Sequence, residues 1–188
     1  MPNWCNNNTT IEFSSKETAD EFLKHLELMD NPEAKDVNGN DLTLFGYFVP
    51  EPKYDQEGDA MPGWYWWRVN NWGTKWDAST YHIQRESDTS VFLGFDSAWS
   101  PPIELYDAME EQGISVSASY YEPGMCFVGN YGGEHLDYGH LETADEIRDF
   151  LGADLDDEWN ISEYIREIEL EEAEEEIPEN DSGVESYG

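Results

Sequence analysis

Alternation of apolar and polar residues marks a strand near the start of the chain, and a helical repeat follows it. Residues 4–13 end in the β-branched run Thr9-Thr10-Ile11-Glu12-Phe13, which predicts a strand. Ser14 and Glu17 then have the spacing of a capping box, so we expect a helix to begin there and to run to about Leu28. Its apolar stripe is formed by Ala19, Phe22, Leu23 and Leu26.

The middle of the chain has few regular signals. Residues 30–63 are interrupted repeatedly by proline and glycine, and we interpret them as an insertion loop with one short strand or packed loop at 42–49. Long loops inside a small domain are often functional. Residues 63–69 predict a short helix or turn, and residues 70–77 an aromatic loop.

The next part returns to regular structure. Residues 89–96 predict a strand, Pro102 is well placed at the start of a helix that runs to about Gln112, and 114–121 with 125–131 predict a hairpin. This order of elements predicts an α+β fold, a ferredoxin-like antiparallel sheet with helices on one face, over residues 1–140.

Residues 141–188 read as an acidic helical extension that ends in a solvated tail. Thr143 and Glu146 form a second capping box, which opens a short helix that Gly152 closes. A last helix is predicted from about Asp156 to Glu176, and Pro178 stops it.

Charge narrows the choice of partners. The chain has 43 acidic and nine basic residues, a net charge of −34, and half of that net charge lies in residues 141–188. Such a surface repels nucleic acid and anionic membranes and attracts basic proteins. Adaptation to high salt is an alternative cause, but it would spread the acid evenly. Two cysteines, no long apolar run and no signal peptide predict a soluble protein of the cytoplasm.

The acidic helix carries the leading functional hypothesis. If residues 156–176 are one helix, they span about 31 Å with close to one net charge per 3 Å, while one strand of B-DNA carries a phosphate about every 3.4 Å. We expect this row to imitate nucleic acid and to bind a basic protein that handles nucleic acid; a solvated acidic tail is the alternative. The candidate row is Asp156, Asp157, Glu158, Glu163, Glu167, Glu171, Glu174 and Glu175.

An aromatic group gives the second hypothesis, a ligand-binding module. Trp72, Lys75, Trp76 and Trp99 form a candidate platform on which a nucleotide or a sugar would stack. The alternative is that these indoles are buried in the core.

Enzymatic chemistry is the third hypothesis, a metal-assisted hydrolase that uses acids near Asp77 and Asp96. No phosphate cradle or nucleophile elbow accompanies them, so we name no catalytic residue and expect a protein that is not an enzyme. His135, Asp137 and His140 have the residue types of a metal site, but solvated loop histidines are the simpler interpretation. We therefore expect no metal and no cofactor.

Three tryptophan-containing blocks carry a resemblance to a known family. Pro2-Asn3-Trp4-Cys5 with Asn7, then 71–77, then 98–102, resemble the YubB-like ferredoxin-like domain family of plasmids and phages over about residues 1–132. The resemblance implies a ferredoxin-like fold and a mobile-element setting, but no activity. Two cysteines cannot supply the four thiolates of an iron–sulfur cluster. Together with the charge, it suggests a phage or plasmid accessory protein of the anti-defence type. Such a protein would act in the host cytoplasm and inhibit a basic host protein by DNA mimicry.

Overall fold

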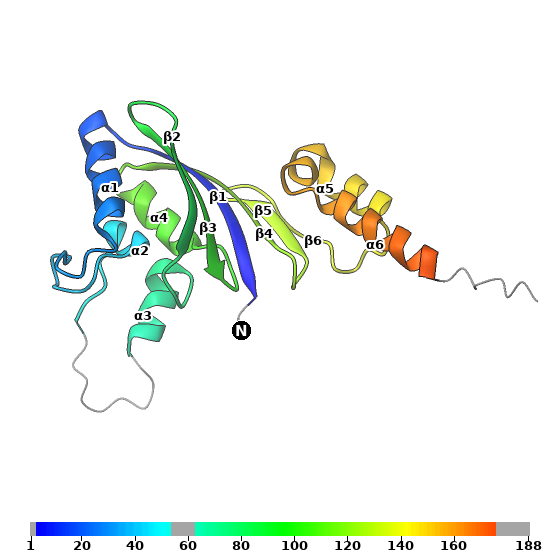
Figure 1. Cartoon of the computed structure of the whole chain (residues 1–188), viewed down its shortest axis with the longest axis horizontal. Coiled ribbons are helices and arrows are strands. Elements are labelled where there is room, and N and C mark those ends of the chain that lie inside the picture. Colours follow the sequence, from blue (N-terminus) through cyan, green and yellow to red (C-terminus); the bar gives the residue numbers. More distant parts are fainter. Residues whose placement is uncertain (1–2, 54–62, 176–188) are drawn as a thin grey trace, which may run out of the picture. The chain divides into compact units, whose positions relative to one another are not determined.

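The chain folds into two compact units, Met1–Asp137 and Tyr138–Gly188. The computed structural model describes residues 3–53 and 63–175, without the side chains of residues 79–81, 174 and 175. The division lies three residues before the expected end of the first domain at residue 140. All the described strands belong to the first unit and the acidic helices to the second (Figure 1).

The described residues of the first unit form a six-stranded antiparallel sheet in the order β2-β3-β1-β4-β5-β6. The predicted α+β class with an antiparallel sheet is confirmed. The strands are β1 (Trp4–Glu12), β2 (Ser79–Arg85), β3 (Ser90–Ala98), β4 (Ser115–Glu122), β5 (Phe127–Asn130) and β6 (His135–Asp137). Neither β2 nor β6, which lie at the two edges, is predicted from the sequence.

The central strand β1 shows why the alternation forms a sheet. β3 and β4 pair with it on either side, from Trp4 opposite Ala98 to Glu12 opposite Ser90 and Ser115. Its side chains at positions 5, 7, 9 and 11 are buried, while Trp4 and Glu12 at its ends are exposed. One face of β1 therefore belongs to the core, as its period of two requires.

The helices of the first unit are α1 (Lys16–Leu28), α2 (Leu44–Phe48), α3 (Gly63–Trp72) and α4 (Ile103–Glu111). The core forms where they meet the sheet: Phe22 of α1 and Tyr106 of α4 are buried together with Ile11 and Phe95 of the strands. The Tyr106 hydroxyl reaches Thr9 Oγ1 at 2.8 Å, so each of these two buried hydroxyl groups has a partner. Helix α1 begins one residue later than predicted, because Ser15 and not Ser14 caps it.

The insertion is held by specific polar contacts. Residues 44–48 form the short helix α2, so the strand that was one option for 42–49 is wrong. Arg68 of α3 donates two hydrogen bonds to the Glu51 carboxylate, and its guanidinium lies over the rings of Trp64 and Trp72. Residues 54–62 of the predicted insertion lie outside the described residues.

Asp77 fixes the start of α2 from a distant part of the chain. Its carboxylate accepts hydrogen bonds from the backbone N–H groups of Leu44 (3.0 Å) and Phe45 (2.8 Å), while the Thr43 side chain accepts from Gly46. These are the donors that a helix N-terminus leaves unsatisfied. Asp77 therefore has a structural role at the start of α2.

The second unit is a pair of helices, α5 (Ala144–Trp159) and α6 (Ile161–Glu175), which we call the acidic hairpin. Its apolar core residues are Ala144, Ile147, Leu151, Leu155 and Ile161. Asn160 is left-handed (φ 53°) and separates the helices, so the prediction of one continuous helix over 156–176 is wrong. Gly152 bends α5 at the point where the sequence predicted an end. No helix in the described ranges is long and apolar enough to cross a membrane.

The capping carboxylate of Asp77 predicts a pH dependence of stability. Burial raises the pKa of Asp77 to about 6, against the lowering effect of hydrogen bonds from Phe45, Leu44 and Ala78. Folding therefore favours the protonated Asp77 carboxyl. The stabilisation that this proton gives to the folded state is complete below about pH 4, and it is lost as the pH rises through about 6. We expect the wild type to lose about 2–3 kcal/mol of unfolding free energy relative to Asp77→Asn between pH 4 and 6.5, measured by urea denaturation.

Asp41→Asn is the matched control, because Asp41 is an exposed carboxylate paired with Lys35. Its denaturation midpoints should follow those of the wild type over the same pH range. Parallel curves for the wild type and Asp77→Asn would contradict the raised pKa.

Candidate functional site

A buried carboxylate closes the turn of the acidic hairpin. Asp156 is 1% exposed and accepts hydrogen bonds from the backbone N–H (2.7 Å) and the hydroxyl (2.6 Å) of Ser162. Arg148 donates to Asp156 (2.6 Å) and to Asp157 (2.8 Å). Each oxygen of Asp156 is therefore used inside the hairpin, and this residue cannot belong to an exposed acidic row; its assignment to that row is corrected.

An ion pair and a hydrogen bond also join α5 and α6 at the other end of the hairpin. Arg166 of α6 donates to Asp145 of α5 at 2.8 Å and lies 4.0 Å from Glu163. The Glu169 carboxylate accepts from the backbone N–H of Ala144, at the start of α5 (2.9 Å). Both arginines of the second unit are thus held by acids of the same unit.

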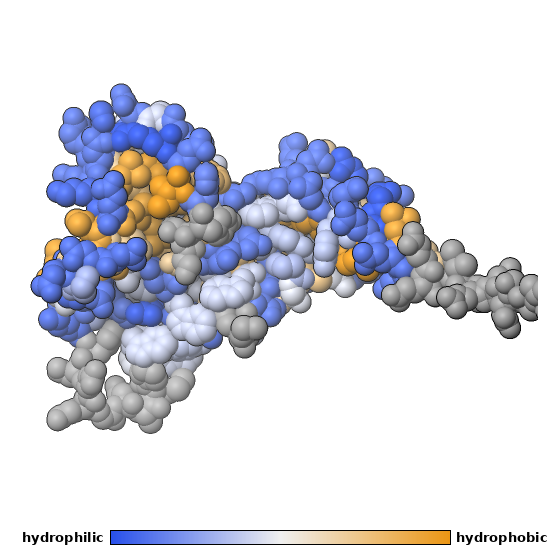
Figure 2. Space-filling view, viewed as in Figure 1, coloured by the Kyte–Doolittle hydropathy of each residue, from blue (hydrophilic) through white to orange (hydrophobic). Residues whose placement is uncertain are grey.

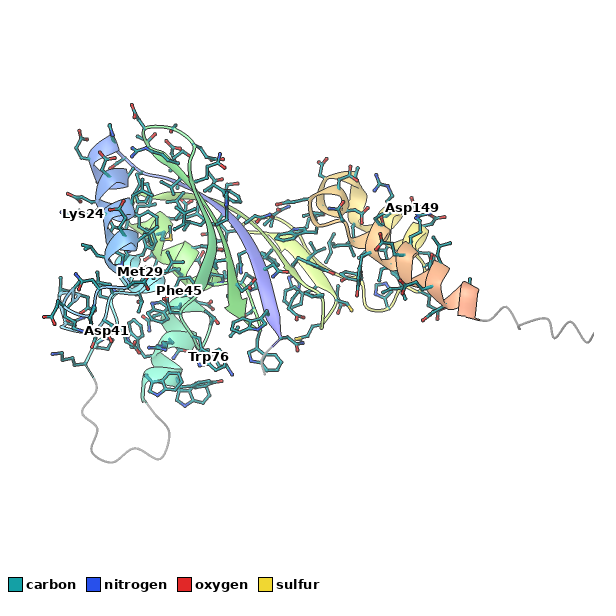
Figure 3. The ribbon with its side chains drawn as sticks, in the orientation of Figure 1. Lys24, Met29, Asp41, Phe45, Trp76 and Asp149 are labelled. Atoms are coloured by element: carbon teal, nitrogen blue, oxygen red, sulfur yellow. The ribbon has the colours of Figure 1, made fainter. Side chains whose placement is uncertain are left out.

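The remaining carboxylates of the predicted row face solvent. Asp157, Glu158, Glu163, Glu167 and Glu171 are all exposed. Figure 2 shows hydrophilic residues over much of the acidic hairpin, and Figure 3 shows Asp149 on α5 among them. Glu174 and Glu175 lie at the end of α6, where the side chains are outside the described part of the structure.

Helix α6 gives this row its spacing. Glu163, Glu167 and Glu171 follow one another at intervals of four residues, which places them on one side of the helix, about 6 Å apart along its axis. The whole of α6 holds seven acids in 15 residues, over about 22 Å. With Arg166 counted, α6 carries a net charge of −6, about one per 3.7 Å, which is somewhat below the predicted density and lies on a shorter helix.

The structure divides the predicted aromatic platform. Trp72 is completely buried and its indole N–H donates to Val49 at 3.0 Å, so it is a core residue and its place in the platform is corrected. Trp76 and Trp99 are exposed by 37% and 44%. Trp4, which the sequence did not place in the platform, is 41% exposed, and its ring lies 6.1 Å from that of Trp76.

Lys75 lies between the exposed indoles. Its ammonium nitrogen is 4.1 Å from the centroid of the Trp76 ring and 5.8 Å from that of Trp99. We call Trp4, Lys75, Trp76 and Trp99 the tryptophan cluster. It lies where β1 begins and β3 ends, with Trp76 beside α3 (Figure 3).

Two loops present the cluster, and hydroxyl groups join them. Thr74 donates to the carbonyl of Ala98 and Ser100 to the carbonyl of Gly73, both at 3.0 Å. Gly73 has a φ of 81°, and a Cβ there would overlap the Glu104 carboxylate. Trp99 also has a positive φ, 75°, which is rare for a bulky residue and costs about 1–3 kcal/mol. The fold therefore keeps a strained backbone where it exposes an indole.

The other candidate residues have partners of their own. Asp96 accepts a hydrogen bond from the Asn6 amide at 2.6 Å, and Asp77 caps α2. His135 contacts the Tyr120 hydroxyl (3.1 Å), and His140 packs edge-on against Phe150. Within the described residues, no three His, Cys, Asp or Glu side chains form a group able to hold a metal ion.

Comparison with protein-family models, with curated proteins and with solved structures found no match to this chain. The resemblance of its tryptophan blocks to the YubB-like family accordingly stays a prediction.

The turn of the hairpin predicts different effects for two adjacent acids. Asp156→Ala should destabilise the acidic hairpin by about 2–4 kcal/mol, because it leaves Arg148 and the Ser162 N–H without a buried partner. Asp157→Ala, which removes an exposed carboxylate, should change stability by less than about 1 kcal/mol. Amide hydrogen exchange across α5 and α6 measures both. Equal exchange rates in the two variants would show that Asp156 does not stabilise the turn.

Proposed function

We propose that this chain is a non-enzymatic binding protein whose acidic hairpin occupies the basic, nucleic-acid-binding surface of another protein. The binding energy comes from carboxylates of α5 and α6 that replace phosphates on that surface. The partner is thus a protein that handles DNA or RNA, and the complex blocks its access to nucleic acid.

One observation supports this most strongly. Both arginines of the hairpin pair with carboxylates of the same unit, while many of its other carboxylates are exposed to solvent. Arg148 and Arg166 both pair with carboxylates of the same unit. The side chains of Glu163, Glu167 and Glu171 are exposed along one side of α6. Like charges four residues apart weaken a helix by a few tenths of a kcal/mol per pair, so this arrangement opposes the stability of α6 unless a basic surface meets it.

The shape of the hairpin also suits a preorganised ligand. Hydrogen bonds from Ser162 to Asp156 and from Ala144 to Glu169 hold its two ends. A rigid acidic surface loses less entropy on binding than a disordered acidic tail would lose. This favours a specific partner over a purely solubilising role.

We further propose a ferredoxin-like arrangement for the core of the first unit. Its elements follow the order β1-α1-β2-β3-α4-β4, and the strands lie in the order β2-β3-β1-β4, which agrees with the β-α-β-β-α-β motif. With the resemblance of the tryptophan blocks, this supports a phage or plasmid accessory protein that acts in the host cytoplasm against a defence nuclease or a polymerase.

Charge neutralisation tests the proposal. Host proteins are first enriched on DNA-cellulose and then passed over the immobilised chain at about 50 mM and 500 mM salt, because screening by salt should release a partner held by charge. We expect wild type to retain a basic protein at low salt only. The variant Glu163→Gln with Glu167→Gln and Glu171→Gln should retain at least tenfold less of it.

The matched control carries the same change of three charges on the first unit, at Glu21, Glu27 and Glu111, which are exposed helical acids. It should retain the partner as wild type does. If both triple variants retain the same proteins to the same extent, the acidic hairpin does not bind the partner specifically. Its carboxylates then only keep the surface solvated.

A further inference from the structure

We propose that the tryptophan cluster is a receptor for a cationic side chain of a basic partner, an arginine above all, and that Lys75 is its internal occupant. This inference deepens the proposed function, because it rests on a basic partner and names a second surface that binds it. The incoming guanidinium displaces the Lys75 ammonium and lies over the exposed faces of Trp76 and Trp99.

The position of Lys75 is the first argument. Six of the nine basic residues of the chain form ion pairs within the described residues: Lys16, Lys35, Arg68, Arg85, Arg148 and Arg166. Lys75 has no carboxylate within ion-pair distance among those residues, and its ammonium lies over indole rings. In a chain with 43 carboxylates, a cation that lies over rings shows that the cluster is a favourable place for positive charge.

The comparison with Arg68 supports this interpretation. The Arg68 guanidinium also lies over two indoles, but it is half-buried and its hydrogen bonds go to Glu51. It is therefore a fixed part of the fold. Lys75 has no such anchor in the described residues, and a four-carbon stem lets its ammonium leave the rings without any change in the backbone.

The indoles themselves are rigid and accessible. Trp4, Trp76 and Trp99 are each exposed by about two fifths, and Trp99 is held by a backbone conformation that bulky residues rarely adopt. Thr74 and Ser100 fasten the two loops to each other. Exposed, preorganised tryptophans of this kind are typical of residues that dominate binding energy at protein interfaces.

Charge selects the class of ligand. A nucleotide brings phosphates to a chain of net charge −34, and the nearest cation, Lys75, is already engaged by the rings. A cationic side chain is instead attracted by the whole molecule, and the Glu104 carboxylate lies against Gly73 of the loop that carries Lys75 and Trp76. Arginine is favoured over lysine because its planar guanidinium stacks on an indole face. A nucleotide and a sugar, the ligands suggested by the sequence, become outcomes of the test.

The test uses the full chain with ¹⁵N-labelled tryptophan and the blocked peptide acetyl-Gly-Arg-Gly-Arg-Gly-amide. We expect the indole N–H signals of Trp76 and Trp99 to shift saturably in NMR titration. The same peptide with citrulline, an uncharged analogue of arginine, should leave them unchanged. Lys75→Met removes the internal occupant and should tighten peptide binding about two- to five-fold, the equivalent of an exposed cation–π contact.

Lys75→Arg is the matched control, because it keeps an occupying cation and should bind no more tightly than wild type. Weaker or unchanged binding in Lys75→Met would overturn the proposal. So would indole shifts with adenosine monophosphate or methyl glucoside in place of the arginine peptide.

The triple glutamine variant of α6 separates this proposal from the previous one. It should bind the arginine peptide at Trp76 and Trp99 as wild type does, although it no longer retains the basic partner. If the variant loses the indole shifts as well, the peptide is held by the acidic hairpin and the tryptophan cluster is not its receptor.

Discussion

This protein has nine basic and 43 acidic side chains, so each ion pair within the fold uses one of very few cations. Arg68 fastens the insertion to α3 through Glu51, and Arg148 and Arg166 fasten the two ends of the acidic hairpin. Arg85 ties the β2 edge of the sheet to Asp20 of α1. Because cations are used in this way, few are left to offset the exposed carboxylates, and the surface remains strongly negative.

The same constraint links the two proposed binding surfaces. The acidic hairpin presents carboxylates whose neighbouring arginines are already paired, and it offers a basic surface many unneutralised charges on a rigid support. The tryptophan cluster holds its cation on rings, where a competing cation can replace it. Both surfaces therefore favour a partner rich in arginine and lysine, and both oppose direct binding of nucleic acid.

The sequence predicted those helices and strands that are determined by the spacing of residues close together in the chain. Alternation identified β1 and the β4–β5 hairpin, and helical spacing identified α1. Long-range contacts decided the rest. Nothing in 70–77 shows that Trp72 is buried and Trp76 exposed, because α3 and the paired loops determine this. The left-handed Asn160 and the buried Asp156 follow from the packing of α5 on α6, and the edge strand β2 has too polar an exposed face to show a clear period.

A competition experiment shows whether the chain replaces nucleic acid on a basic protein. Fluorescence anisotropy would follow a labelled DNA duplex bound to the protein that the chain retains from a host lysate. We expect the chain to displace the duplex completely. Added duplex should raise the apparent dissociation constant of the chain linearly with the duplex concentration. A stable ternary complex, in which the duplex stays bound while the chain saturates its partner, would contradict it.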